Sequence, residues 1–174
     1  MSRYRGPLVR KARRYGVMLF NNGNSKQNAF KKRKYAPGQH GRSSFKSLSE
    51  YGKQLQEKQK ARFMFGITEK QFRKYYQKAL KMKGDTSEHL VSLLETRLDA
   101  IIYRMNIAPT VFAARQLINH GHIEVNDKRV TIPSFSVSTK DIICVRKKSL
   151  QHPVVLETTD KAPRDIPDYL EFDK

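Results

Sequence analysis

The spacing of apolar residues divides the chain near residue 47, because regular helical spacing begins only there. Residues 1–46 show little periodicity and offer too little apolar surface to repay the entropy of ordering a chain. Beyond them Leu48, Tyr51 and Leu55 follow i, i+3, i+7 spacing, which predicts a helix with an apolar stripe that ends near Gly66. The pattern therefore predicts an extended arm followed by a helical region.

A second helix is predicted after a capping box, in which Thr68 and Gln71 cover each other's free backbone amides. It ends at Gly84, whose lack of a side chain suits a helix C-terminus. One face of this helix is apolar and largely aromatic, which favours core residues over a base-stacking platform. That face consists of Phe72, Tyr75, Tyr76, Ala79 and Leu80.

The second half of the chain combines helical and strand patterns. A third helix is predicted over 85–105, and a short helix capped by Thr110 follows over 111–120. Alternating residues over 123–132 predict a hairpin, and 141–145 a further strand. From residue 151 onward the chain is Pro-rich and acidic, which predicts an extended tail.

Together these elements predict an α+β protein with four parts. The first part is a basic extended arm and the second a mainly helical domain. The third is an inserted small module of two packed helices and a short β-sheet, and the fourth is a tail that returns to the first domain. The predicted boundaries are 1–46, 47–95, 96–148 and 149–174.

Charge is distributed very unevenly between the two halves. Of the 35 basic and 16 acidic residues, 23 basic and 3 acidic side chains lie in residues 1–83, a net charge of +20, which leaves −1 for residues 84–174. The acidic residues of the chain do not balance this excess, so the compensating negative charge must come from an external polyanion. A membrane surface would require a continuous Leu/Phe/Trp stripe opposite the basic face, and the chain has no Trp. The charge therefore favours nucleic acid over membrane.

The single cysteine excludes an intramolecular disulfide and a multi-cysteine zinc site. Cys144 lies in an apolar run, which favours a buried strand thiol, and we expect no cofactor, metal or small-molecule substrate. Residues 1–20 are Arg-rich and free of acids like a transit peptide. Pro7 interrupts any helix there and the same charge pattern continues beyond residue 20, so we expect mature protein.

The module carries a compact basic face that suits the phosphates and shallow minor groove of an RNA duplex. Its residues are Arg104, Arg115, His120, His122, Lys128 and Arg129. Here the sequence resembles the RNA-binding module named after small-subunit ribosomal protein S four, in Arg97-Leu98-Asp99, Ala108-Pro109-Thr110, Ala113-Ala114-Arg115-Gln116-Leu117, His120-Gly121-His122-Ile123 and Val125-Asn126.

The resemblance extends over nearly the whole chain, in the same order as in that ribosomal protein family. It includes Pro37-Gly38-Gln39-His40-Gly41, Tyr51-Gly52, Gln54-Leu55, Glu57-Lys58-Gln59-Lys60, Glu69-Lys70-Gln71-Phe72-Arg73 and Pro167-Asp168-Tyr169-Leu170. The resemblance implies a non-enzymatic constituent of the small ribosomal subunit. Such a protein binds small-subunit ribosomal RNA at a five-prime domain junction early in assembly. It lies near the messenger RNA entry side and contacts neighbouring proteins, notably number five, at an interface linked to translational accuracy.

By position, the resemblance also implies which residues contact RNA. In the arm and first domain these are Arg3, Tyr4, Arg13, Arg14, Gln39, His40, Tyr51, Gln54, Lys58 and Arg73. In the module they are Thr110, Arg115, His120, His122, Asn126 and Lys128.

Three departures from the family change the expectations. Many members carry a four-cysteine zinc knuckle near the N-terminus, which the single cysteine excludes here. The hairpin turn is Asn126-Asp127 where Asn-Gly is usual, and this leaves the turn type open, because Asp tolerates positive φ less well than Gly. The family also continues past Leu170 with a strand-forming segment. We expect its contacts to be absent or made by something else.

Two enzymatic or metal alternatives follow from single motifs. Arg97-Leu98-Asp99 resembles the catalytic motif of some pseudouridine synthases, but their separate catalytic domain has no counterpart here, so a cap or salt-bridge role for Asp99 is favoured. The pair His120 and His122 has no third ligand nearby in the sequence, so contact with RNA or an exposed position is favoured over metal binding.

A stand-alone RNA chaperone or ribosome-rescue factor built on the same module is the alternative function. Such a protein would not need the Pro-Gly-Gln-His-Gly arm. The Lys- and Asn-rich composition favours a ribosome of the mitochondrial matrix, with a bacterial cytoplasm as the alternative.

Overall fold

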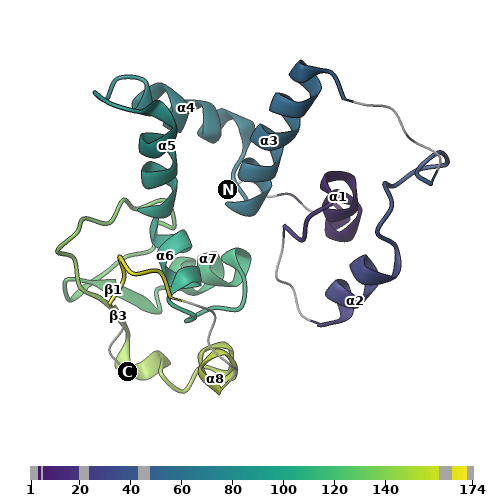
Figure 1. Ribbon diagram of the computed structural model, residues 1–174. Helices are drawn as coiled ribbons and strands as arrows, with labels where there is room; N and C mark the ends of the chain where they lie inside the picture. The colour runs from purple at the N-terminus through teal and green to yellow at the C-terminus, as the bar shows by residue number, and fades with distance from the viewer. Residues whose placement is uncertain (1–3, 5, 20–23, 43–47, 161–165, 172–174) are drawn as a thin grey trace. The chain divides into compact units, whose positions relative to one another are not determined.

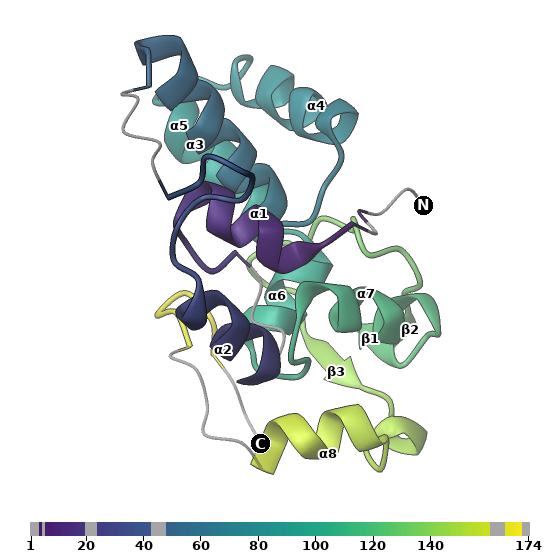
Figure 2. The same ribbon diagram turned by 90° about the vertical axis from the view of Figure 1, so that its right-hand side faces the viewer.

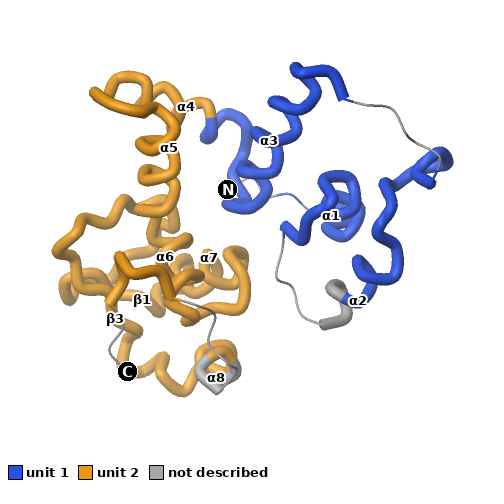
Figure 3. Tube along the Cα trace, in the orientation of Figure 1, with its two compact units in different colours: residues 1–72 blue, residues 73–174 orange. Residues whose placement is uncertain are grey.

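The computed structural model divides the chain into two compact units, residues 1–72 (unit 1) and 73–174 (unit 2), which Figure 3 distinguishes by colour. It describes residues 4, 6–19, 24–42, 48–160 and 166–171. Within these residues the chain forms eight α-helices and one small antiparallel sheet. The predicted α+β fold is thereby confirmed.

Unit 1 begins with two short helices, α1 (Leu8–Tyr15) and α2 (Asn24–Lys32), shown in Figure 1. The prediction of an arm without regular structure is wrong for these two segments. Helix α1 buries Tyr15, whose ring centroid lies 6.0 Å from that of Phe63. Because Phe63 is far along the chain, the spacing within the arm gives no sign of this packing.

Helix α3 (Glu50–Met64) begins at the cap Ser49, whose hydroxyl accepts a hydrogen bond from the Gly52 amide. The predicted apolar stripe of this helix is not core. Leu48, Tyr51 and Leu55 are all exposed, and Tyr51 retains 73% of its surface. Only Phe63, near the C-terminal end of α3, is fully buried, because the described part of unit 1 covers α3 there.

Helix α4 (Glu69–Ala79) begins where the capping box predicts it, since Thr68 Oγ1 accepts from the Gln71 amide at 3.4 Å. Its predicted apolar face is only partly core. Phe72 and Ala79 are buried, whereas Tyr76 and Leu80 are about half exposed.

In unit 2 the predicted helix 85–105 is two helices, α5 (Thr86–Glu95) and α6 (Leu98–Arg104). The break has a long-range cause. The backbone of Arg97 adopts an extended conformation and forms an isolated β-bridge with Ser136. The next amide, of Leu98, donates to the Phe135 carbonyl at 2.9 Å. This pairing replaces the helical hydrogen bonds and could not be read from the sequence, where Leu90, Leu94 and Leu98 continue the helical spacing across the break.

The module continues with α7 (Val111–Asn119) and a sheet of strand order β2-β1-β3. The strands are β1 (Ile123–Val125), β2 (Lys128–Arg129) and β3 (Ile143–Val145), which are shorter than the predicted runs. Both turn residues have positive φ, 50° at Asn126 and 59° at Asp127. These values are typical of a type I′ hairpin turn, so Asp127 occupies the left-handed region in spite of its side chain.

The core of unit 2 lies between α6, α7 and the buried side of the sheet, which lie side by side in Figure 1. It consists of Leu98, Ile102, Ile107, Ala108, Ala114, Leu117, Ile118, Ile123, Val125 and Val155. Cys144, in β3, is exposed, so the prediction of a buried thiol is wrong. Its position alternates with those of Ile143 and Val145, which pack against the core.

The prediction of an extended tail is wrong over residues 153–160. A 3₁₀ turn (Lys147–Ser149) leads into α8 (Pro153–Asp160), visible beyond β3 in Figure 2. Helix α8 contributes Val155 to the core, and the Thr158 hydroxyl donates to the Ile107 carbonyl at 3.0 Å. Val154 and Val155, too few for a periodic pattern, thus find their apolar partners only in the folded module.

Candidate nucleic-acid interface

Cations of unit 1 gather around Lys11, on α1. Its ammonium lies 5.6 Å from the Tyr4 ring centroid and 5.3 Å from that of Phe63. Burial, and then the neighbouring guanidinium groups of Arg14, Arg62 and Arg10, lower the pKa of Lys11. Several cations therefore lie close together on this face. Their combined positive potential favours binding of an anion. Tyr4 also packs edge-on against Phe63, at 5.4 Å.

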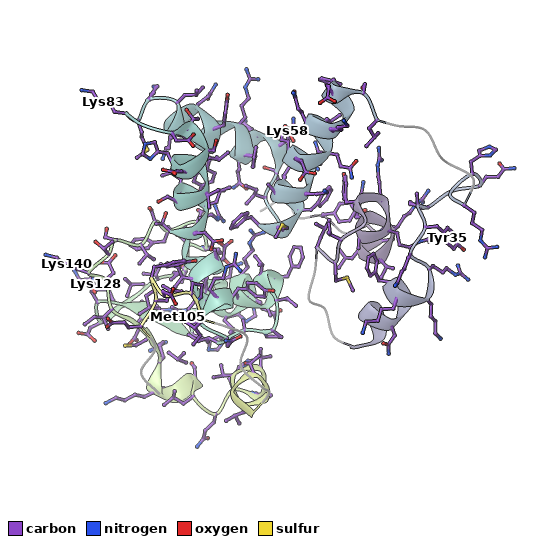
Figure 4. The ribbon with its side chains drawn as sticks, viewed as in Figure 1. Tyr35, Lys58, Lys83, Met105, Lys128 and Lys140 are labelled. Atoms are coloured by element: carbon purple, nitrogen blue, oxygen red, sulfur yellow. The ribbon has the colours of Figure 1, made fainter. Side chains whose placement is uncertain are left out.

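Arg13 fixes the segment that precedes the Pro-Gly-Gln-His-Gly motif. Its Nε donates to the Tyr35 carbonyl at 3.1 Å and its Nη2 to the Ala36 carbonyl at 3.3 Å. Its guanidinium lies 4.8 Å from the Tyr35 ring centroid, and that of Arg42 lies 4.9 Å away. Arg13 thus has an internal structural role, and Tyr35, labelled in Figure 4, is held between segments far apart in sequence.

The glycines of this motif permit a tight turn. Gly38 has a φ of 110°, and the Gly41 amide donates to the Gly38 carbonyl at 3.2 Å. A Cβ at Gly41 would collide with the carbonyl oxygen of Ala36, so only glycine fits. The turn presents Gln39 and His40 at the surface, as expected for residues that contact a partner.

Of the remaining first-domain candidates, Tyr51, Gln54 and Arg73 are exposed. Lys58 is half-buried, and its ammonium lies 2.7 Å from a carboxylate oxygen of Glu69. This hydrogen bond is the largest cause that lowers the pKa of Glu69, although burial opposes it. Arg14 is exposed, and the candidate Arg3 lies outside the described residues.

In the module, two of the expected surface cations are used internally. Both Asp99 oxygens accept from Arg97, at 2.9 and 2.7 Å, and Oδ2 also accepts from Arg115 Nε at 2.6 Å. Arg97 further donates to the Tyr75 hydroxyl at 2.7 Å. Arg115 therefore serves the fold through a carboxylate that is only 1% exposed, and Arg104 likewise pairs with Glu95.

This network bears on the enzyme alternative. A nucleophilic aspartate needs a free oxygen at an open site, whereas both oxygens of Asp99 are buried and accept hydrogen bonds from two guanidinium groups. The Arg97-Leu98-Asp99 motif is thus a buried ion pair, as the salt-bridge interpretation predicts.

The hairpin end of the module presents exposed polar side chains. His120, Asn126 and Lys128 are exposed, and Lys128 points away from the fold in Figure 4. Two hydrogen bonds, each of 2.9 Å, fix the orientation of the Asn126 side chain. Its Nδ2 donates to Asp141, and its Oδ1 accepts from the Ile142 amide. A hydrogen bond from the Ser138 amide, followed by that from Asn126, lowers the pKa of Asp141.

Thr110 acts locally as a cap. Its hydroxyl accepts from the Ala113 amide at 3.0 Å and begins α7. His122 is half-buried, and its Nδ1 lies 2.8 Å from the Ser149 hydroxyl. Its ring also lies 5.0 Å from that of His152, which the sequence placed in the tail and which we did not predict as a site residue. Only the fold of residues 147–152 brings these two rings together.

Burial, and then the nearby His152, His120, Arg146 and Arg129, lower the pKa of His122 from its usual 6.5. The folded state thus disfavours the protonated ring relative to the unfolded chain. This contribution to stability is complete above pH 6.5 and is lost as the pH falls below it. We expect the melting temperature to fall less between pH 7.5 and 5.5 in His122→Gln than in the parent, as measured by circular dichroism. An equal fall in both proteins would contradict this.

Within the described ranges, no cluster of three or more His, Cys, Asp or Glu side chains could hold a metal ion. No described helix is long and apolar enough to cross a bilayer.

The module of two packed helices and a small sheet defines a protein of the S4-domain class. Residues 96–143 match the family described as the S4 domain, and residues 3–95 match the family described as the ribosomal protein S4/S9 N-terminal domain.

Curated relatives identify the family more closely. The chain is 54% identical to small ribosomal subunit protein uS4 of Granulibacter bethesdensis, over 92% of this chain and 78% of that protein. It is 50% identical to uS4c of Oltmannsiellopsis viridis, over 100% of this chain and 84% of that protein. It is 51% identical to uS4 of Lysinibacillus sphaericus, over 99% and 84%. The chain belongs to the small ribosomal subunit protein uS4 family.

This membership confirms the predicted family. The family consists of structural ribosomal proteins and not of enzymes, which confirms the prediction that the chain has no catalytic activity.

Proposed function

We propose that this chain is a structural constituent of the small ribosomal subunit that binds small-subunit ribosomal RNA through both units. One observation carries the proposal. The +20 charge of residues 1–83 lies largely on exposed side chains, and the described ion pairs of this region involve only Glu50, Glu57 and Glu69. A surface with so few internal counter-charges requires an external polyanion, and ribosomal RNA supplies one.

We also propose the finer roles that the family resemblance implies. The chain binds the five-prime domain junction early in assembly, neighbours messenger RNA at its entry side, and contacts other small-subunit proteins, notably number five. Its RNA contacts include the exposed candidates Arg14, Gln39, His40, Tyr51, Gln54, Arg73, His120, Asn126 and Lys128, together with the half-buried His122. The contributions of Tyr4, Arg13, Lys58, Thr110 and Arg115 are largely to position these neighbours, since each makes internal contacts.

For the location of the ribosome we propose the mitochondrial matrix, with a bacterial cytoplasm as the alternative. The relatives include bacterial proteins and an organellar one, and they are similarly identical to this chain. Antibody or tag localisation in the source cell distinguishes the two compartments.

A salt titration tests the RNA-binding proposal. We expect log K for a five-prime-domain RNA fragment to fall by about 0.7–0.9 per contacted phosphate for each unit rise in log salt, because each phosphate contact releases condensed counterions. Six or more contacts would weaken binding by about 1,000-fold or more between 50 and 200 mM salt. Filter binding or fluorescence anisotropy measures this slope, and a nearly flat slope contradicts the proposal.

The alternative of a stand-alone RNA chaperone or rescue factor predicts that the protein does not stay bound to the small subunit. A constituent remains with the small subunit through sucrose-gradient sedimentation in high salt, whereas a transient factor dissociates. The Pro-Gly-Gln-His-Gly turn favours the constituent, because a factor built on the module alone would not need it.

A further inference from the structure

Three histidines of unit 2 lie together although they come from different elements. The ring centroid of His122, which precedes β1, lies 6.1 Å from that of His120, at the end of α7. It lies 5.0 Å from that of His152, which precedes α8. His120 is exposed and the other two are half-buried, so solvent or a ligand reaches the group. We refer to these three residues as the histidine cluster.

The Nδ1 atoms of two rings already have internal roles. His122 Nδ1 lies 2.8 Å from the Ser149 hydroxyl, and His152 Nδ1 accepts from the Val154 amide at 3.3 Å. An accepting Nδ1 fixes the neutral tautomer of His152 with its proton on Nε2. Nε2 of His152 is thus a donor to a ligand, and both nitrogens of His122 are donors once its ring is protonated.

The charged groups around the histidine cluster are mainly positive. Arg129 of β2 donates to the His120 carbonyl at 3.2 Å, and Arg146, after β3, lies 3.5 Å from the Gly121 carbonyl. Glu124 of β1 is the nearby acid, and it pairs with Arg146 at 3.0 Å. From the 3₁₀ turn, Lys147 and Lys148 are exposed and add further positive charge. Among the described side chains the local charge therefore stays positive even after the Glu124–Arg146 pair is counted.

We propose that the histidine cluster, with Arg129 and Arg146, binds a phosphate group of the RNA backbone, and that RNA binding here takes up a proton on His122. The inference rests on the proposed RNA-binding function. A phosphate accepts several charge-assisted hydrogen bonds at once, which suits the imidazole and guanidinium groups that five segments of the chain bring to this place.

The proton goes to His122 for a structural reason. Protonating His152 would place hydrogen on Nδ1, remove the acceptor of the Val154 amide and put a positive charge at the N-terminus of α8. Protonated His122 keeps its contact, because the Ser149 hydroxyl can accept from Nδ1–H. In the free protein, burial is the largest cause that lowers the pKa of His122. The surrounding cations lower it further, because they repel a positive charge on the ring. A bound phosphate reverses the local potential and raises that pKa.

The experiment measures affinity for the five-prime-domain RNA fragment at pH 6.0 and 7.5, at constant ionic strength, with the full chain. Uptake of one proton is expected to make binding about tenfold tighter at pH 6.0. Calorimetry in buffers of different ionisation enthalpy is expected to show net proton uptake at pH 7.0. In His122→Gln the pH dependence and the proton uptake should both be lost.

Two variants serve as controls. His89→Gln removes a half-buried histidine of α5 that contacts the Lys83 carbonyl, and it should keep the full pH dependence. His152→Asn retains a helix-capping side chain and should weaken binding while keeping the pH dependence. Circular dichroism checks that each variant is folded.

The outcomes separate this inference from the proposed function. Tight, salt-dependent binding with equal affinity at both pH values overturns the inference and leaves the RNA-binding function intact. An unchanged pH dependence in His122→Gln also overturns it. Absence of RNA binding at either pH contradicts both.

Discussion

Replacement of Asp99 by asparagine is expected to lower the free energy of unfolding by about 3–5 kcal/mol, the usual cost of removing one partner from a buried ion pair. The carboxylate accepts hydrogen bonds from Arg97 and Arg115 and is almost fully buried. Asparagine has nearly the same shape but one acceptor oxygen, so it leaves a buried guanidinium without its counter-charge. Denaturant unfolding followed by circular dichroism measures the change.

A matched surface substitution shows what the burial contributes. Glu57 pairs with Lys60 at 2.6 Å, but its side chain is 69% exposed. Glu57→Gln should therefore change the free energy of unfolding by less than about 1 kcal/mol. Equal losses in the two variants would mean that Asp99 contributes no more than a surface charge. A catalytic role for Asp99 predicts instead a folded, stable variant that has lost an activity.

The elements that could be predicted are those with local signals. Thr68, Asp85 and Thr110 each accept a hydrogen bond from a backbone amide two or three residues later, and each helix begins where the sequence indicates. Gly121, with a φ of 74°, follows α7 as expected for a C-terminal glycine. Capping depends on a few neighbouring residues, so the sequence alone contains the necessary information.

The errors have the opposite origin. The break at Arg97, the helix α1 and the helix α8 each depend on a partner far away in the sequence, namely Ser136, Phe63 and Ile107. Likewise, the apolar spacing of Leu48, Tyr51 and Leu55 correctly indicates a helix but not whether anything covers it. Periodicity reports local conformation, whereas burial depends on the rest of the fold.

The candidate interface shows the same division. Exposed candidates such as Gln39 and Lys128 are found by composition and family resemblance. Composition counts every cation equally, however, and cannot show that Arg115 and Arg104 are neutralised by Asp99 and Glu95. Charge available to a partner is therefore smaller in the module than its sequence suggests, and the unpaired cations of unit 1 matter more.

The largest loss of RNA affinity is expected when four consecutive cations, two at the end of α2 and two just after it, are removed together. Lys31, Lys32, Arg33 and Lys34 are all exposed, and none makes an ion pair with a described residue. Replacing all four by glutamine should lower the slope of log K against log salt by about 3 if each contacts a phosphate. Affinity at 0.1 M salt should then fall by about 100- to 1,000-fold.

Two lysines that already form ion pairs, Lys53 and Lys60, provide the control. Lys53 and Lys60 lie 2.7 and 2.6 Å from Glu50 and Glu57, so each pair adds almost no net charge to the surface. Lys53→Gln with Lys60→Gln frees two acidic groups, yet these lysines release few counterions on binding, so the salt slope should change by less than about 1. If the loss per charge were the same at both places, net charge alone would govern affinity. A larger loss per charge at residues 31–34 would instead show that the RNA contacts the cations the fold leaves without acidic partners.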